Sequence, residues 1–189
     1  MDHGFTTLLD AVNASDFPAV KYLVTVANVA LDQGSPLAVA VSKRKTEIGS
    51  YLIHHGANSN KSDFFGTSAL HYAARTNNLV NMKELLKSGA QANTRDKSGV
   101  TPLHLASLYG WPKCVALLLK AGASPHQATT LGVYPVDLCL ASLLRRTQGL
   151  FTASTDVNDM KRYAFNERQM VKNGVTDHQV FTHKQLLAS

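Results

Sequence analysis

Apolar and polar residues recur in blocks along the middle of this chain, between residues 66 and 132. Each block opens on a glycine, continues with a short apolar run, breaks at polar residues, and closes with a second apolar run and another glycine. Within the runs the apolar residues fall on one face of a helix. A glycine suits the left-handed residue that ends many helices. The pattern therefore predicts pairs of short helices joined by turns, and an all-α fold.

The same block occurs twice at a fixed offset. Residues 33 positions apart match at Gly66 and Gly99, Leu70 and Leu103, His71 and His104, Ala73 and Ala106, Leu85 and Leu118, and Gly89 and Gly122. A fixed period of about 20 to 50 residues is the signature of a solenoid. Weaker copies cover residues 35–63 and begin again at Gly132. The first unit is shortened, because the matching residues Ala11 and Ala40 are only 29 positions apart.

Two motifs carry a family resemblance. One is T-P-L-H-L-A at Thr101–Ala106, matched by S-A-L-H-Y-A at Ser68–Ala73, and the other is L-L-x-x-G-A at Leu85–Ala90 and Leu118–Ala123. On these residues the chain resembles ankyrin-repeat proteins. The resemblance implies a solenoid of about five helix-turn-helix units joined by β-hairpin-like loops. We expect the units at about residues 6–33, 35–63, 66–96, 99–130 and, in part, 132–150, so that the array occupies residues 1–150.

The chemistry of helix ends supports the same units. Thr101 can cap a helix, and Pro102 is tolerated at the first helical position, where its missing N–H has no intrahelical partner. One helical hairpin this short cannot bury its own apolar face, whereas stacked neighbours can. The first unit lacks the T-P-L-H turn, and we expect it to cap the N-terminal end of the array.

Residues 151–189 depart from the repeat. The preceding partial unit has Asp137 in place of the histidine, and no second L-L-x-x-G-A follows it. Helical patterns with capping residues begin at Thr155 or Asp156 and at Thr176. These segments are expected to form a C-terminal helical cap on the array or, alternatively, a tail that binds a partner.

The composition indicates a packed intracellular chain, either cytoplasmic or nuclear. Apolar residues make up 44% and charged residues 17% of the sequence, which is the balance of a folded domain. The two cysteines, Cys114 and Cys139, suggest no disulfide framework. The N-terminus lacks the pattern of a secretory signal, and no apolar run approaches the roughly 18 residues of a membrane span.

No catalytic or metal-binding constellation is visible. The sequence has no glycine-rich phosphate loop, no nucleophile with a placed base, and no histidines at zinc spacing. We therefore expect no enzyme activity, no metal and no cofactor.

The net charge of +6 is concentrated in the middle of the chain. Residues 1–33 carry a net charge of −3, whereas residues 34–147 carry +8. Lys43, Arg44 and Lys45 fall between the two helices of the second unit. They are candidates for contact with an acidic partner or for a weak nuclear-import signal, and the alternative is an ordinary solvated turn.

A pair of phenylalanines occupies the tip of one hairpin. In the ankyrin template the residues between Asp63 and Gly66 lie at a projecting tip, and here they are Phe64 and Phe65. Exposed aromatic residues often mark contact surfaces, and Lys97 holds the matching tip position in the next unit. The alternative is that one ring folds inward against the neighbouring hairpin.

The turns between paired helices supply further candidates. These are Arg75, Leu108, Tyr109 and Trp111. Arginine, tyrosine and tryptophan are the types enriched at interface hot spots. The alternative is that Leu108 and Trp111 pack on a neighbouring repeat. Asn77 matches Gly110, and both residue types can adopt the left-handed conformation of a tight turn.

The resemblance also implies structural roles for four turn residues. His71 and His104 are expected to hydrogen-bond within their own turns, to Ser68 and Thr101 respectively, and to tie each turn to the start of its helix.

Asn60 and Asn93 occupy the places where the family uses asparagine to brace the hairpin. Hydroxylation by an intracellular asparaginyl hydroxylase is known at this place in the family, and it is a hypothesis for both residues here.

The sequence as a whole favours a non-enzymatic protein-protein interaction module. Another protein, with an acidic surface as one option, would bind the hairpin tips and the concave helix face of a monomeric array. One alternative is the substrate-recognition adaptor of a ubiquitin ligase, recruited through residues 151–189. A second is a basic array that binds nucleic acid, although three clustered basic residues are few for that role. No membrane contact is expected.

Overall fold

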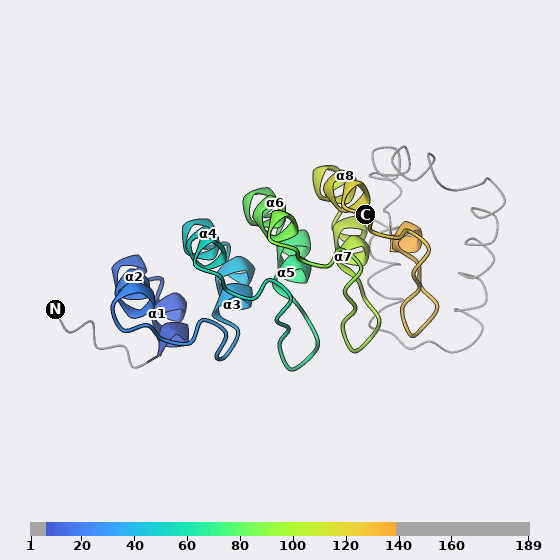
Figure 1. The fold of residues 1–189 in the computed structure, drawn as a ribbon. Coiled ribbons are helices and arrows are strands. Elements are labelled where there is room, and N and C mark those ends of the chain that lie inside the picture. Colours follow the sequence, from blue (N-terminus) through green and yellow to red (C-terminus); the bar gives the residue numbers. More distant parts are fainter. Residues whose placement is uncertain (1–6, 139–189) are drawn as a thin grey trace.

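The computed structural model describes residues 7–138, which form a row of short helices (Figure 1). In chain order these are α1 (Leu8–Ala14), α2 (Phe17–Thr25), α3 (Pro36–Ser42), α4 (Thr46–His54), α5 (Ala69–Thr76), α6 (Leu79–Lys87), α7 (Pro102–Leu108), α8 (Pro112–Lys120) and the 3₁₀ helix η1 (Pro135–Leu138). The predicted all-α fold is confirmed. The C-terminal cap or tail expected at 151–189 lies outside the described residues, and the boundary at residue 150 stays a prediction.

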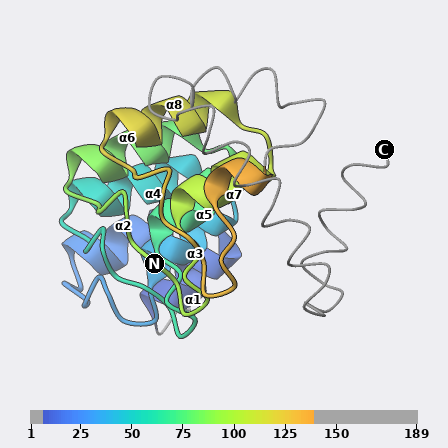
Figure 2. The same ribbon diagram turned by 90° about the vertical axis from the view of Figure 1, so that its right-hand side faces the viewer.

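Consecutive helices pair, and the pairs stack side by side. α1, α3, α5 and α7 form what we call the inner row, in which each helix packs against the next. α4, α6 and α8 pack in the same way in the outer row, which α2 begins (Figure 1). Viewed along the stack, each pair is displaced from the one before it, so the array twists gradually (Figure 2). None of the described helices is long and apolar enough to cross a membrane.

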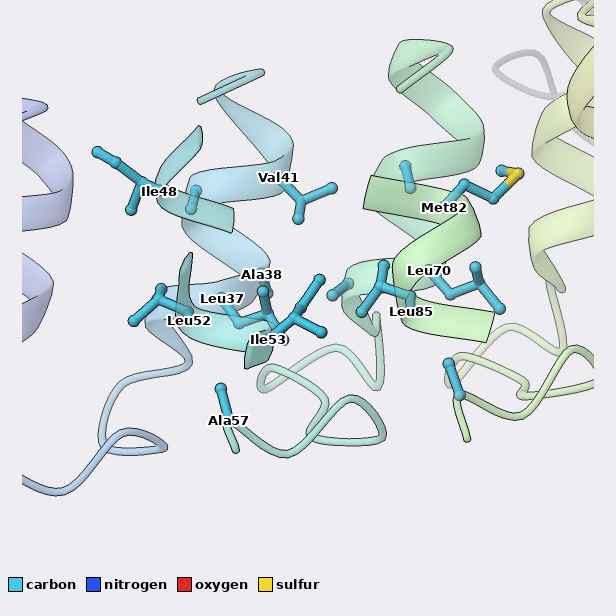
Figure 3. Close-up of a cluster of buried hydrophobic side chains, with 14 of the residues drawn as sticks. Leu37, Ala38, Val41, Ile48, Leu52, Ile53, Ala57, Leu70, Met82 and Leu85 are labelled. Carbon is cyan, nitrogen blue, oxygen red and sulfur yellow. The ribbon is translucent and has the colours of Figure 1, made fainter. Parts of the chain in front are cut away.

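Small and large apolar residues alternate through the core at the period of the repeat. The four matching alanines of the inner row, Ala11, Ala40, Ala73 and Ala106, are completely buried. The absence of a longer side chain lets successive inner helices approach closely. Leu52, Leu85 and Leu118 of the outer row are also completely buried, and each such leucine stabilises the fold by about 1.5–3 kcal/mol. Figure 3 shows how Leu52 and Leu85 lie with their neighbours between adjacent pairs.

The turn inside each pair needs one residue in the left-handed conformation. Arg44, Asn77 and Gly110 hold this position at φ values of 58°, 55° and 63°. The prediction for Asn77 and Gly110 is therefore confirmed. Glycine adopts this conformation without strain and asparagine tolerates it, whereas arginine pays a conformational cost.

The junction between the second and third units contains a buried polar cluster. Asn81 of α6 is completely buried, and its side-chain amide donates to the backbone oxygen of Thr46 at 3.1 Å and to Ser50 Oγ at 3.1 Å. Ser50 Oγ donates in turn to Glu84 Oε2 at 2.6 Å. Gly49 of α4 leaves the space that the Asn81 side chain occupies, because a Cβ atom on Gly49 would lie 2.8 Å from Asn81 Oδ1.

Three long loops project from the same side of the stack as hairpins (Figure 1). Each is closed by a backbone hydrogen bond, from Asp63 to Thr67, from Asp96 to Val100 and from Thr129 to Val133. The tips are also joined to one another: the Lys97 N–H donates to the Phe65 oxygen at 3.0 Å, and the Thr130 N–H donates to the Ser98 oxygen at 2.9 Å. The three tips therefore form one hydrogen-bonded row.

Candidate interaction surface

The first hairpin is held rigid by its own aspartate. Asp63 Oδ1 accepts the backbone N–H groups of Phe65 and Thr67, each at 2.9 Å. Asp63 Oδ2 accepts the hydroxyl of Tyr72, on the first turn of α5, at 2.7 Å. Partial burial alone would raise the pKa of Asp63, but the hydrogen bonds from Tyr72, Thr67 and Phe65 outweigh it and hold this pKa below its usual value. One carboxylate thus fixes the tip relative to the inner row.

Phe64 and Phe65 project from this tip into solvent, with 80% and 66% of their surfaces exposed. Their rings meet edge to face, with centroids 5.5 Å apart. The ammonium group of Lys97, from the next hairpin tip, lies 3.9 Å from the centroid of the Phe64 ring, at the distance of a cation–π contact. Neither ring folds inward, so the alternative interpretation of the sequence does not hold.

A second pair of a cation and an aromatic ring lies on α5. The Arg75 guanidinium is 5.3 Å from the centroid of the Tyr72 ring. Tyr72 is not among the residues predicted from the sequence. It directly follows the motif histidine, His71, in α5. Because consecutive helical residues point in different directions, the burial of His71 leaves Tyr72 nearer the surface. Burial, followed by the bond to Asp63, raises the pKa of the Tyr72 hydroxyl, so this group stays protonated and keeps donating.

The matching turn of the fourth unit presents apolar residues. Tyr109 is exposed and Leu108 is half-buried. Trp111 has a structural role, because it packs partly buried against the core and its indole N–H donates to the Arg75 backbone oxygen at 3.3 Å. The Trp111 contact joins the turns of the third and fourth units.

The basic turn of the second unit is exposed, as its position between two helices predicted. Lys43 ends α3, and its ammonium group donates to Asn13 Oδ1 of the first unit at 2.8 Å. Arg44 is exposed at the left-handed position of the turn. Both residues lie in the turn between α3 and α4 and not on a hairpin tip.

The two motif histidines join neighbouring units as well as their own turns. The Ser68 backbone N–H donates to His71 Nδ1 at 3.1 Å, which makes Nδ1 an acceptor and leaves the proton on Nε2. His71 Nε2 then donates to the Val100 oxygen of the next hairpin at 3.0 Å.

His104 repeats this arrangement in the fourth unit. Its Nδ1 accepts from the Thr101 N–H at 3.1 Å, and its Nε2 lies 3.0 Å from the Val133 oxygen. The predicted bonds within each turn are present, and the bond to the next unit was missed because it depends on stacking. Burial lowers the pKa of both histidines, that of His104 to about 4.

The two hairpin asparagines also bind forward to the next unit. Asn60 donates to the Gly89 oxygen at 3.0 Å and accepts the Gln91 N–H at 2.9 Å. Asn93 makes the equivalent pair of bonds, to the Gly122 oxygen at 2.8 Å and from the Ser124 N–H at 2.7 Å. Their hydroxylation stays a hypothesis. Within residues 7–138 no group of three histidine, cysteine or acidic side chains is placed to hold a metal ion.

Residues 57–129 match the family of ankyrin repeats, in three copies. Residues 57–129 are therefore ankyrin repeats, which confirms the resemblance found in the sequence. Ankyrin repeats are generally protein-interaction modules and are typically non-catalytic. A search among curated proteins found no match.

Proposed function

We propose that this protein is a non-enzymatic interaction module that holds a partner protein on its hairpin tips and inner helices. The observation that carries the proposal is the exposed pair Phe64 and Phe65 on a tip that Asp63 and the neighbouring hairpin hold in place. We call the surface around this pair the tip surface. It comprises Phe64, Phe65, Tyr72, Arg75 and Lys97, which the contacts described above connect.

Rigidity makes such a surface suitable for binding. The hydrogen-bonded row of tips and the bond from Tyr72 to Asp63 order the contact residues before any partner arrives. A pre-ordered surface avoids much of the entropy that association otherwise costs. Most binding energy in protein interfaces comes from a few aromatic and arginine residues, which are the types gathered here.

The proposal is tested by proximity labelling in cells with the full chain and with a Phe64→Ala, Phe65→Ala double variant. We expect the double variant to lose a distinct set of labelled proteins, because its two anchors are removed. A Val26→Ala, Val80→Ala variant is the matched control. It truncates two apolar residues that are 66% and 52% exposed outside the tip surface, and it should label the same proteins as the natural chain.

Circular dichroism and thermal unfolding must accompany the labelling. Both variants should retain the helical spectrum, since all four side chains are largely exposed. An unchanged set of labelled proteins in the phenylalanine variant would overturn the proposal, and so would an equal loss in the control. Loss of the helical spectrum in the phenylalanine variant would show that the rings act in folding and would also contradict it.

A further inference from the structure

We infer that the partner segment held on the tip surface is acidic and carries a bulky apolar side chain, and that it lies at the open end of the row of hairpins. This inference rests on the proposed function and specifies the chemistry of the partner. It is carried by three features of the tip surface: an uncovered flank, two stacked cations, and carboxylates that are turned inward.

The uncovered flank results from the shortened first unit. Each later hairpin tip is hydrogen-bonded to the tip before it, Lys97 to Phe65 and Thr130 to Ser98. The loop before α3 belongs to the shortened interval from Ala11 to Ala40. It meets the next loop at Asn58, whose N–H donates to Asp32 Oδ1 at 2.9 Å, and among the described residues no backbone hydrogen bond joins it to the tip at Phe64 and Phe65. The Phe64–Phe65 tip therefore begins the row with no hairpin in front of it. This explains why two adjacent phenylalanines remain exposed, and it leaves room beside them for an apolar side chain from a partner.

Two cations border the aromatic residues at fixed positions. Lys97 is held over the Phe64 ring and Arg75 over the Tyr72 ring. A cation stacked on a ring loses little side-chain entropy on binding, because the contact already restricts it. Its N–H groups stay available for carboxylates, and a guanidinium can bind one with two parallel hydrogen bonds.

The neighbouring carboxylates of the tip surface are used inside the hairpins. Asp63 accepts the bonds from Phe65, Thr67 and Tyr72 described above, and Asp96 Oδ1 accepts the N–H groups of Ser98 and Val100. Both aspartates thus stabilise the loops from within. The outward-facing charges of this surface are cationic, so an acidic segment is its electrostatic complement.

An acidic peptide fits these features better than a nucleic acid does. A base would stack on a free aromatic face, but Phe64 and Phe65 meet edge to face at 83° and Lys97 lies over the Phe64 ring. Other exposed lysines, Lys83 and Lys113 among them, lie on the outer helices α6 and α8. The exposed cations are thus spread over hairpin loops, turns and outer helices and do not form one track along a phosphate backbone.

The inference is tested with the full chain and short fluorescein-labelled synthetic peptides, by fluorescence anisotropy. The first peptide is rich in glutamate and has a central phenylalanine. In a second peptide alanine replaces that phenylalanine, and in a third glutamine replaces every glutamate. We expect the first peptide to bind about tenfold more tightly than either of the others, since each lacks one of the two required features.

Charge reversals in the protein locate the binding site. The variant Arg75→Glu, Lys97→Glu should weaken binding of the first peptide by about tenfold or more. The matched control is Lys83→Glu, Lys113→Glu, which changes the net charge equally on the outer helices and should alter affinity by less than about twofold. Should the first variant lose its helical spectrum, Arg75→Gln, Lys97→Gln provides the same test with a smaller change.

The outcomes separate this inference from the proposed function. Equal weakening by both charge reversals, or tighter binding of a single-stranded oligonucleotide of similar charge, would overturn the inference. If the phenylalanine variant loses its cellular partners while the acidic peptide does not bind, the proposed function stands and the inference fails. If that variant keeps all its partners, both fail.

Discussion

The third unit (α5 and α6) and the fourth unit (α7 and α8) are two versions of one repeat. They share fully buried residues at matching places, among them His71 and His104, Ala73 and Ala106, and Leu85 and Leu118. They differ at the tip, where Phe64 and Phe65 of one unit correspond to Lys97 and Ser98 of the other. They also differ on the inner row, where Tyr72 corresponds to Leu105. They also differ in the core, where Asn81 corresponds to Cys114, and in the turn, where Asn77 corresponds to Gly110.

The comparison separates two kinds of position. Shared residues make the bonds and contacts that every unit needs, and their replacement should affect folding. Exposed differing residues change what the surface presents without changing the fold. Asn81, which is buried, and Asn77, which lies in the turn, differ from the matching residues of the fourth unit and alter local stability. The repeat therefore tolerates different residues at these two positions.

The shared histidines should make the array sensitive to acid. The pKa of His104 is about 4 in the folded chain, against a usual value of 6.5. Below pH 6.5 the unfolded chain therefore binds a proton that the folded chain does not, and stability falls as the pH drops from 6.5 toward 4. The gap corresponds to at most roughly 3 kcal/mol for this residue. His71 acts in the same direction, because burial also lowers its pKa. Urea unfolding across this pH range measures the loss.

A His104→Ala variant separates this effect from general acid unfolding. At neutral pH it should lose about 3 kcal/mol of stability, because the Thr101 N–H and the Val133 oxygen lose a buried partner. Between pH 6.5 and 4 its stability should fall less than that of the natural chain. A variant with the full pH dependence would show that the acid sensitivity arises elsewhere.

The buried asparagine of the third unit should couple to the glycine that faces it. Gly49→Ala places a Cβ atom against Asn81 Oδ1 and should cost about 2 kcal/mol, although alanine is the better helix former. In an Asn81→Ala background the obstruction is gone, so the same change should cost much less. A double-mutant cycle by urea unfolding measures the coupling. Additive effects of the two changes would mean that Asn81 moves aside freely.

These residues also show what sequence can and cannot reveal. The helix pairs, the cap at Thr101, and the turn at Lys43 were predictable, because local spacing and end chemistry decide them. The contact of Lys97 with Phe64 was not predictable, because it depends on how two hairpins 33 residues apart stack. The same holds for the bond from Tyr72 to Asp63, whose only sequence signal was the place of Tyr72 beside a buried histidine.

The smallest predicted effects lie in the turns, where the units differ by one residue. Arg44→Gly should stabilise the array by about 0.5–1 kcal/mol, because glycine adopts the left-handed conformation without strain. Asn77→Gly should gain less, since asparagine already tolerates this conformation and its side chain accepts a bond from Cys114 Sγ at 3.3 Å. Gly110→Ala should cost about 1 kcal/mol. Thermal unfolding of the three variants would show whether they follow this order.

Four side-chain bonds that run forward from one unit to the next span the same number of residues. Asn60 to Gly89, His71 to Val100, Asn93 to Gly122 and His104 to Val133 each connect residues 29 positions apart. A copy of one 33-residue unit inserted in register would therefore offer acceptors to the unit before it and donors to the unit after it, with no new residue required. Gene duplication can lengthen such a chain one whole unit at a time, and each added hairpin would extend the hydrogen-bonded row of tips.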